Sequence, residues 1–140
     1  MKRLILICLL IASSLVVAAC GESKEDKAKK QVCSSRSDIQ KQVNSLKGLT
    51  PATATTNGIK GSLNAIKSDL QKITDAQGNL NDQRKQQVQS ANKEFSSQFK
   101  SIVSNLGTNI SISGAQAQLQ SALQQLSSAY QTSLAPIDCS

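Results

Sequence analysis

Apolar residues recur at intervals of three and four along most of the chain, which is the spacing of helices that bury one face. The intervals predict four helices, over residues 35–47, 57–75, 81–106 and 115–134. Apolar positions in the second helix average 3.5 residues apart, the period of a coiled coil, and those in the third average 3.6, the period of a straight amphipathic helix. The predicted fold class is all-α: an up-and-down bundle of about four coiled-coil-like helices.

Glycine and proline residues separate the predicted helices. Glycine closes helices readily because it has no Cβ, and proline cannot continue a helix because it lacks the N–H donor. These residues follow the predicted helix ends: Gly48 and Pro51, Gly78, Gly107, and Pro136. A chain of 140 residues with four such segments fits a single domain.

Residues 21–32 are densely charged and admit two interpretations. One is a solvated tether, because such a segment has little apolar surface to bury. The other is a helix, because Ser23 and Asp26 are spaced as a capping box and acidic residues precede lysines by four positions. We expect a marginal helix that acts as a spacer and makes no contact with the core.

The first 20 residues have the layout of an export signal. Basic residues at positions 2 and 3 precede an apolar run of 16 residues, from Leu4 to Ala19, which is shorter than the roughly 20 residues of a membrane-spanning helix. Small residues then lead to a cysteine. An uncleaved membrane anchor is the alternative interpretation.

The segment Val17-Ala18-Ala19-Cys20 resembles the lipobox of bacterial lipoproteins. The resemblance implies that residues 1–19 are a lipoprotein signal peptide and that Cys20, bearing diacylglycerol, begins the mature chain. Residues 20–32 are then the lipidated cysteine and its charged tether, and residues 33–140 are the helical bundle domain. Two or three acyl chains suffice for stable anchoring. The expected location is outside the cytoplasm, on the outer face of the cell membrane or on an outer membrane.

The four cysteines can then be assigned. Cys8 lies in the removed signal and Cys20 carries lipid, which leaves Cys33 and Cys139 as a pair in an oxidising compartment. A disulfide between them predicts that the start and end of the bundle domain lie together, as an even number of antiparallel helices requires. The alternative is two free thiols.

Composition argues against most chemistry. The chain has no His, which removes Ser-His-Asp triads, Cys-His dyads and imidazole metal ligands. Aromatic residues make up 2%, too few for a platform on which single-stranded nucleic acid stacks. The carboxylates are expected to be solvated surface charges. We therefore predict no enzyme activity, no catalytic residue, no metal, no cofactor and no nucleic-acid partner.

Two features leave room for binding. Phe95, Phe99 and Tyr130 are expected in the core, or else along a ligand pocket between the third and fourth helices. Residues 20–140 carry 14 Lys or Arg and 9 Asp or Glu, a net charge of +5, and the only charge after residue 100 is Asp138. The Gln- and Ser-rich last helix is either a neutral polar surface or a face for a partner.

The region after the signal also resembles uncharacterised secreted or lipid-anchored bacterial helical proteins, which have a cysteine near each end, here Cys33-Ser34 and Cys139-Ser140. That resemblance implies a fold and a location. The first hypothesis is a membrane-anchored, non-catalytic structural or interaction module that meets an envelope protein or polymer. The alternatives are a binding protein for a small apolar ligand or an anionic envelope polymer, and a small hydrolase.

Overall fold

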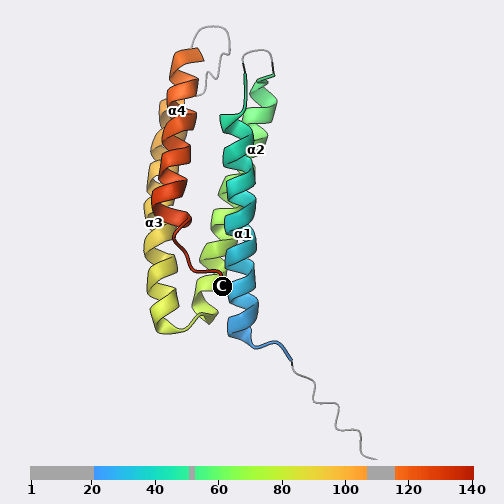
Figure 1. Ribbon diagram of the computed structural model, residues 1–140, viewed down its shortest axis with the longest axis vertical. Helices are drawn as coiled ribbons and strands as arrows, with labels where there is room; N and C mark the ends of the chain where they lie inside the picture. Colours follow the sequence, from blue (N-terminus) through green and yellow to red (C-terminus); the bar gives the residue numbers. More distant parts are fainter. Residues whose placement is uncertain (1–20, 51–52, 107–115) are drawn as a thin grey trace, which may run out of the picture.

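The computed structural model describes residues 21–50, 53–106 and 116–140. It is an antiparallel, up-and-down bundle of four helices, which confirms the predicted fold class (Figure 1). Two short turns of other helical types follow α2 and α4. The elements are α1 (Lys24–Lys47), α2 (Thr56–Ala76), the 3₁₀ turn η1 (Gln77–Asn79), α3 (Asp82–Leu106), α4 (Gln116–Ala129) and the π-helical turn η2 (Tyr130–Leu134).

Several predictions from the sequence lie outside these residues. The signal peptide, the lipobox and Cys20 precede them, and the expected helix end at Gly107 lies in the segment between α3 and α4. Of the helices in the described part of the chain, none is both long enough and apolar enough to cross a bilayer.

Helix α1 begins at Lys24, inside the segment expected to be a spacer. The capping interaction at Ser23 is present, because its hydroxyl accepts the main-chain N–H of Asp26 at 3.0 Å. The expectation of no core contact is wrong, since Ala28 and Val32 are only 4% and 2% exposed. These two residues extend the apolar stripe of α1 towards its N-terminus at the same helical spacing, so the surrounding charges lie on the other faces of a core helix.

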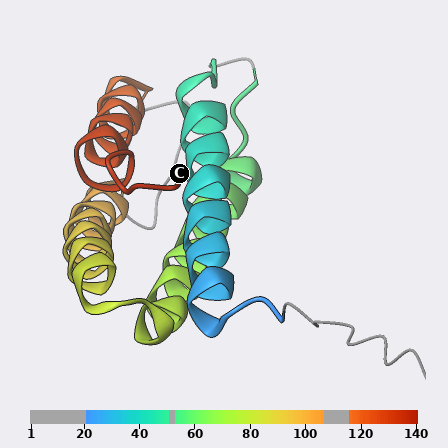
Figure 2. The ribbon, with the colours of Figure 1, turned by 60° about the horizontal axis from the view of Figure 1, so that its bottom comes forward.

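The core is built from one apolar stripe per helix. Each helix packs against its neighbour in sequence and α4 closes the ring against α1, so no described helix lies in the centre (Figure 2). Phe95 and Tyr130 are the largest fully buried side chains. The other fully buried residues are mainly β-branched or leucine: Val32, Ile39, Val43, Leu46, Ile59, Ile66, Ile73, Val88, Leu126 and Leu134.

Two successive segments pack in the place of a full-length fourth helix: α4 with η2, and then the non-helical C-terminal tail. Helix α4 and turn η2 have 14 and 5 residues, whereas α3 has 25, so η2 ends partway along α3 (Figure 1). Residues 135–140 then cross from η2 to α1 and place Ile137, 3% exposed, in the core. The predicted disulfide between Cys33 and Cys139 is present and joins this tail to α1. The Cα–Cα distance between the two cysteines is 5.7 Å.

Candidate functional site

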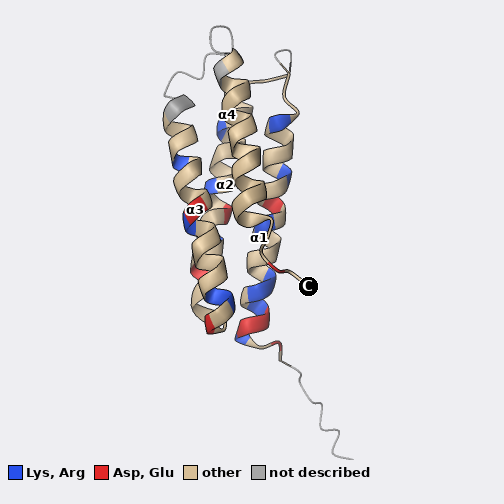
Figure 3. Cartoon of the chain, turned by 60° about the vertical axis from the view of Figure 1, so that its left-hand side comes forward, with Lys and Arg blue, Asp and Glu red and all other residues tan. Residues whose placement is uncertain are grey.

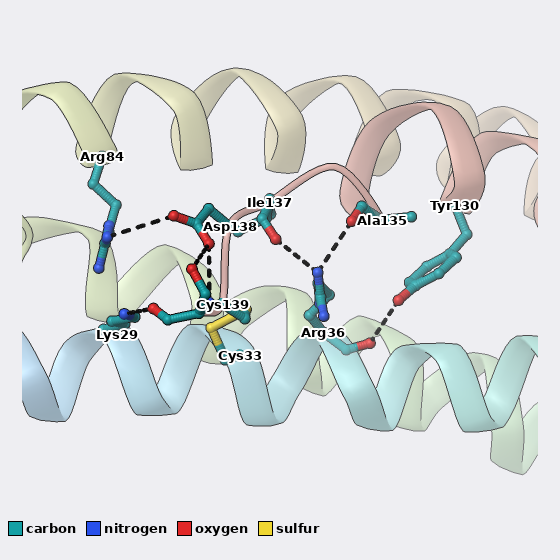
Figure 4. The surroundings of a disulfide bond; sticks show 10 residues. Lys29, Cys33, Arg36, Arg84, Tyr130, Ala135, Ile137, Asp138 and Cys139 are labelled. Atoms are coloured by element: carbon teal, nitrogen blue, oxygen red, sulfur yellow. Dashed lines mark hydrogen bonds and ion pairs between the residues drawn. A yellow bond between two sulfur atoms is a disulfide. The ribbon is translucent and has the colours of Figure 1, made fainter.

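The tail is held against α1 by a clasp, which we define as Cys33, Arg36, Tyr130 and residues 135–140 (Figure 4). The Arg36 Nη1 group donates hydrogen bonds to the carbonyl oxygens of Ala135, at 3.0 Å, and Ile137, at 2.7 Å. The Tyr130 hydroxyl donates to the carbonyl of Arg36 at 3.3 Å. One arginine therefore satisfies two main-chain carbonyls that lack helical partners.

Asp138 forms hydrogen bonds at the C-terminal end of the clasp. Its Oδ1 accepts hydrogen bonds from the main-chain N–H of Ser140, at 2.9 Å, and from the Ser140 hydroxyl, at 2.6 Å. These bonds lower the pKa of the Asp138 carboxyl, and Arg84, 4.0 Å away, adds to the effect. Lys29 donates to the main-chain oxygen of Ser140 (Figure 4).

The clasp has the properties of a structural element. A shallow, solvent-open hollow of about 640 Å³ adjoins the disulfide, and its charged residues bond to their neighbours: Lys30 to Glu22, Asp26 to Ser23 and Lys29 to Ser140. Within the described residues, no three His, Cys, Asp or Glu side chains are grouped to hold a metal ion. The charged groups around the hollow are therefore committed to the fold, and within the clasp the Arg36 Nε is the buried side-chain atom without a partner.

The three aromatic residues singled out from the sequence lie together. Phe95, Phe99 and Tyr130 are 0%, 6% and 2% exposed. The Phe95 ring meets Tyr130 edge-on and lies nearly parallel to Phe99, with both pairs of ring centroids 6.3 Å apart. Burial raises the pKa of Tyr130 above its usual value of 10.0. The rings thus join α3 to η2 across the core.

A shallow groove does lie between α3 and α4, but it is not an aromatic pocket. Its lining is amide and hydroxyl side chains with one apolar residue, Ile102: Gln98, Ser101, Ser121, Gln124, Gln125 and Ser128 complete it. Helix α4 carries no charge over its whole length, as Figure 3 shows. This face is neutral and polar.

Of the three aromatic residues, Phe99 reaches a different groove, which lies between α2 and α3. We call it the α2/α3 groove; its volume is about 540 Å³. Apolar, amide, hydroxyl and lysine side chains share its lining: Lys67, Leu70, Gln71, Thr74, Asn92, Ser96, Phe99, Lys100, Val103 and Ser104. This mixture suits a ligand with both an apolar part and a charged part.

Asn92 sits on the floor of the α2/α3 groove at 6% exposure. Its Nδ2 donates to the Thr74 hydroxyl at 2.9 Å, but its buried Oδ1 has no hydrogen-bond donor. Asn92 belongs to no motif that the sequence shows. Its spacing could have identified it as a buried polar residue. Asn92 falls between Val88 and Phe95 on the buried stripe of α3, where an apolar residue is expected.

Comparison of the chain with protein-family models, with curated proteins and with solved structures gave no match. Function is therefore inferred from the chemistry of this chain alone.

Proposed function

We propose that the protein is an exported lipoprotein, anchored through Cys20 to the outer face of the cell membrane or to an outer membrane. Its helical bundle is a non-catalytic structural or interaction module. The observation that carries the proposal is the short distance in sequence between the lipobox cysteine and the bundle, because α1 begins at Lys24.

Residues 21–23 reach at most about 11 Å when fully extended. A lipid on Cys20 therefore holds the start of α1 close to the headgroups. Lys24 and Lys27, both exposed, lie at that end of α1 beside Glu22, Glu25 and Asp26, so the lipid, and not a net positive charge, holds this end at the surface. The bundle then stands on the membrane as a fixed module, and residues 21–32 do not act as a long tether.

The disulfide supports the exported location, because structural disulfides persist in oxidising compartments and are rare in reducing ones. The arrangement of carboxylates supports a non-catalytic role, because several of them bond to a side chain on their own helix. Asp69 bonds to Lys72 at 2.7 Å, and Asp38 bonds to Lys41 at 2.9 Å. Paired carboxylates for acid–base catalysis would instead converge on one cleft.

The test is metabolic labelling of bacterial cells that express the full chain with an alkyne analogue of palmitate. The native chain should carry the label in the membrane fraction, and Cys20→Ala should lose both the label and the membrane attachment. Cys8→Ala is the matched control, because it changes a cysteine of the same leader and should remain labelled. Lipid label on Cys20→Ala would refute the anchor assignment.

A second candidate function is the binding of a small ligand, and one observation favours it. The α2/α3 groove brings together apolar surface, two lysines and a buried amide with an unfilled acceptor.

A further inference from the structure

We infer that the α2/α3 groove binds a small amphiphilic anion, whose acidic group lies between Lys67 and Lys100 and whose apolar part lies on Leu70, Phe99 and Val103. This inference rests on the second proposed function and names its site and its ligand class. It does not depend on lipidation of Cys20.

The apolar surface is the first line of evidence. Among the large apolar side chains whose exposure the structure describes, Val103 is the most exposed, at 36%. It lies on the same face of α3 as Phe99, one turn away, and Leu70 faces both from α2. A water-exposed apolar residue beside a concave surface gains free energy when a ligand covers it.

The two lysines are the second line of evidence. The bond from Asn92 to Thr74 fixes the antiparallel register of α2 and α3. Lys67 precedes Thr74 by seven residues and Lys100 follows Asn92 by eight, so both lie about 11–12 Å from that bond, in the same direction. Both are exposed, and neither has an ion-pair partner among the described residues. Two positive charges therefore flank the apolar surface at one level.

The opposite end of the groove has different chemistry. Gln71 donates to the Asp75 carboxylate at 2.8 Å, so a negative charge lies near the end formed by Thr74 and Asn92. Coulomb repulsion from this carboxylate disfavours an anion there. The charge gradient along the groove therefore directs the acidic group of a ligand towards Lys67 and Lys100.

The amide of Asn92 is an independent observation that points to a ligand. A buried acceptor with no donor destabilises a fold, and such groups concentrate at functional sites. Asn92 lies in the groove floor, where a modest shift on binding would bring its Oδ1 to a ligand hydroxyl or amide. The volume of about 540 Å³ fits a single small molecule, such as a medium-chain carboxylic acid.

The probe for the test is decanoic acid that bears a photoreactive diazirine in its chain. The full-length protein is purified from membranes, placed in nanodiscs of neutral phosphatidylcholine, irradiated with the probe and digested for mass spectrometry. Label should concentrate on peptides that contain residues 67–74 and 92–104. Excess decanoate should compete, whereas decyltrimethylammonium, with the same tail and the opposite charge, should not.

The decisive comparison is between two double variants. Lys67→Gln/Lys100→Gln should reduce labelling of the groove at least fivefold. Lys60→Gln/Lys93→Gln removes two exposed lysines of the same helices outside the groove and should leave labelling unchanged. Thermal melts establish that both variants fold. Equal labelling of the two variants, label spread evenly over the surface, or competition by the cation would each overturn the inference.

The palmitate-labelling and photolabelling experiments together separate the two proposals. If Cys20 is not lipidated, the protein carries no palmitate label but still binds decanoate in the groove. If the groove is not a binding site, the palmitate label is retained and the decanoate label loses its dependence on Lys67 and Lys100.

Discussion

Removal of the Cys33–Cys139 disulfide should destabilise the bundle by as much as the largest single truncations in the core. The bond joins residues 106 positions apart, so almost the whole folded chain lies within the loop that it closes. In the reduced protein, the unfolded chain regains the freedom that this loop removed. The folded tail keeps only its noncovalent contacts, chiefly the Arg36 hydrogen bonds and the burial of Ile137.

The magnitude follows from the loop length. A closed loop of about 100 residues lowers the entropy of the unfolded chain enough to stabilise the folded state by about 4–5 kcal/mol. For a domain of this size, each 1 kcal/mol shifts the melting temperature by roughly 3–6 °C. The reduced protein should therefore melt on the order of 15–25 °C lower than the oxidised protein.

The assay is thermal unfolding followed by circular dichroism at 222 nm, with and without a phosphine reductant. Cys33→Ser/Cys139→Ser should melt at the temperature of the reduced protein and should not respond to reductant. A fall of less than about 5 °C on reduction would refute the reasoning. It would show that Arg36 and Ile137 hold the tail without the covalent bond.

Three further changes test the packing and the charges. Asn92→Leu should raise the free energy of unfolding by about 1 kcal/mol, because it removes an unsatisfied buried acceptor at the loss of the bond to Thr74 and a long, 3.5 Å bond to the Leu70 carbonyl; urea unfolding that shows a decrease would contradict this. Phe95→Ala should lower that free energy by about 3–5 kcal/mol, because Phe95 is 0% exposed between Phe99 and Tyr130; a loss below 1 kcal/mol in the same assay would place this ring outside the core. Stability should also fall as pH rises above about 10, because the pKa of Tyr130 is raised by burial and the pKa of Lys72 by its hydrogen bond to Asp69, so the folded state keeps protons that the unfolded state releases. In urea midpoints measured from pH 8 to 11, Tyr130→Phe should show a shallower decline than the native chain, and an equal decline would exclude Tyr130 as a cause.

The spacing of apolar residues predicted the helices correctly. Burying one face of a helix requires an apolar residue every three or four positions. The buried stripe of each helix could therefore be predicted without knowing which other helices it packs against. The pairing of Cys33 with Cys139 was predicted after Cys8 had been assigned to the signal and Cys20 to the lipid, and it agreed with the even number of helices.

The start of α1 was misjudged because charge density was given more weight than periodicity. Seven charged residues between positions 21 and 32 suggested a solvated segment. A helix exposes most of its circumference, so Ala28 and Val32 are enough to fix one face of it to the core. Small apolar residues at the right spacing were the better guide.

The α2/α3 groove could not be predicted, because it depends on how two helices face one another. Lys67 and Lys100 are distant in sequence, and they share one groove only when the register of α2 against α3 is known. The crossing of residues 135–140 to α1 was partly predicted, because Pro136 marked the end of the last helix and the cysteine pair placed Cys139 beside Cys33. The burial of Ile137 in the core depends on the space that the shorter α4 leaves, which no local pattern shows.

The central claim is that this bundle is displayed on a membrane by a lipid on Cys20. Intact-mass spectrometry of the protein extracted from bacterial membranes tests it most directly, combined with sequencing of the modified N-terminal peptide. The account predicts a chain that begins at Cys20 with diacylglycerol in thioether linkage and that contains one disulfide. A chain that retains residues 1–19, or that has an unmodified sulfur at Cys20, would contradict it.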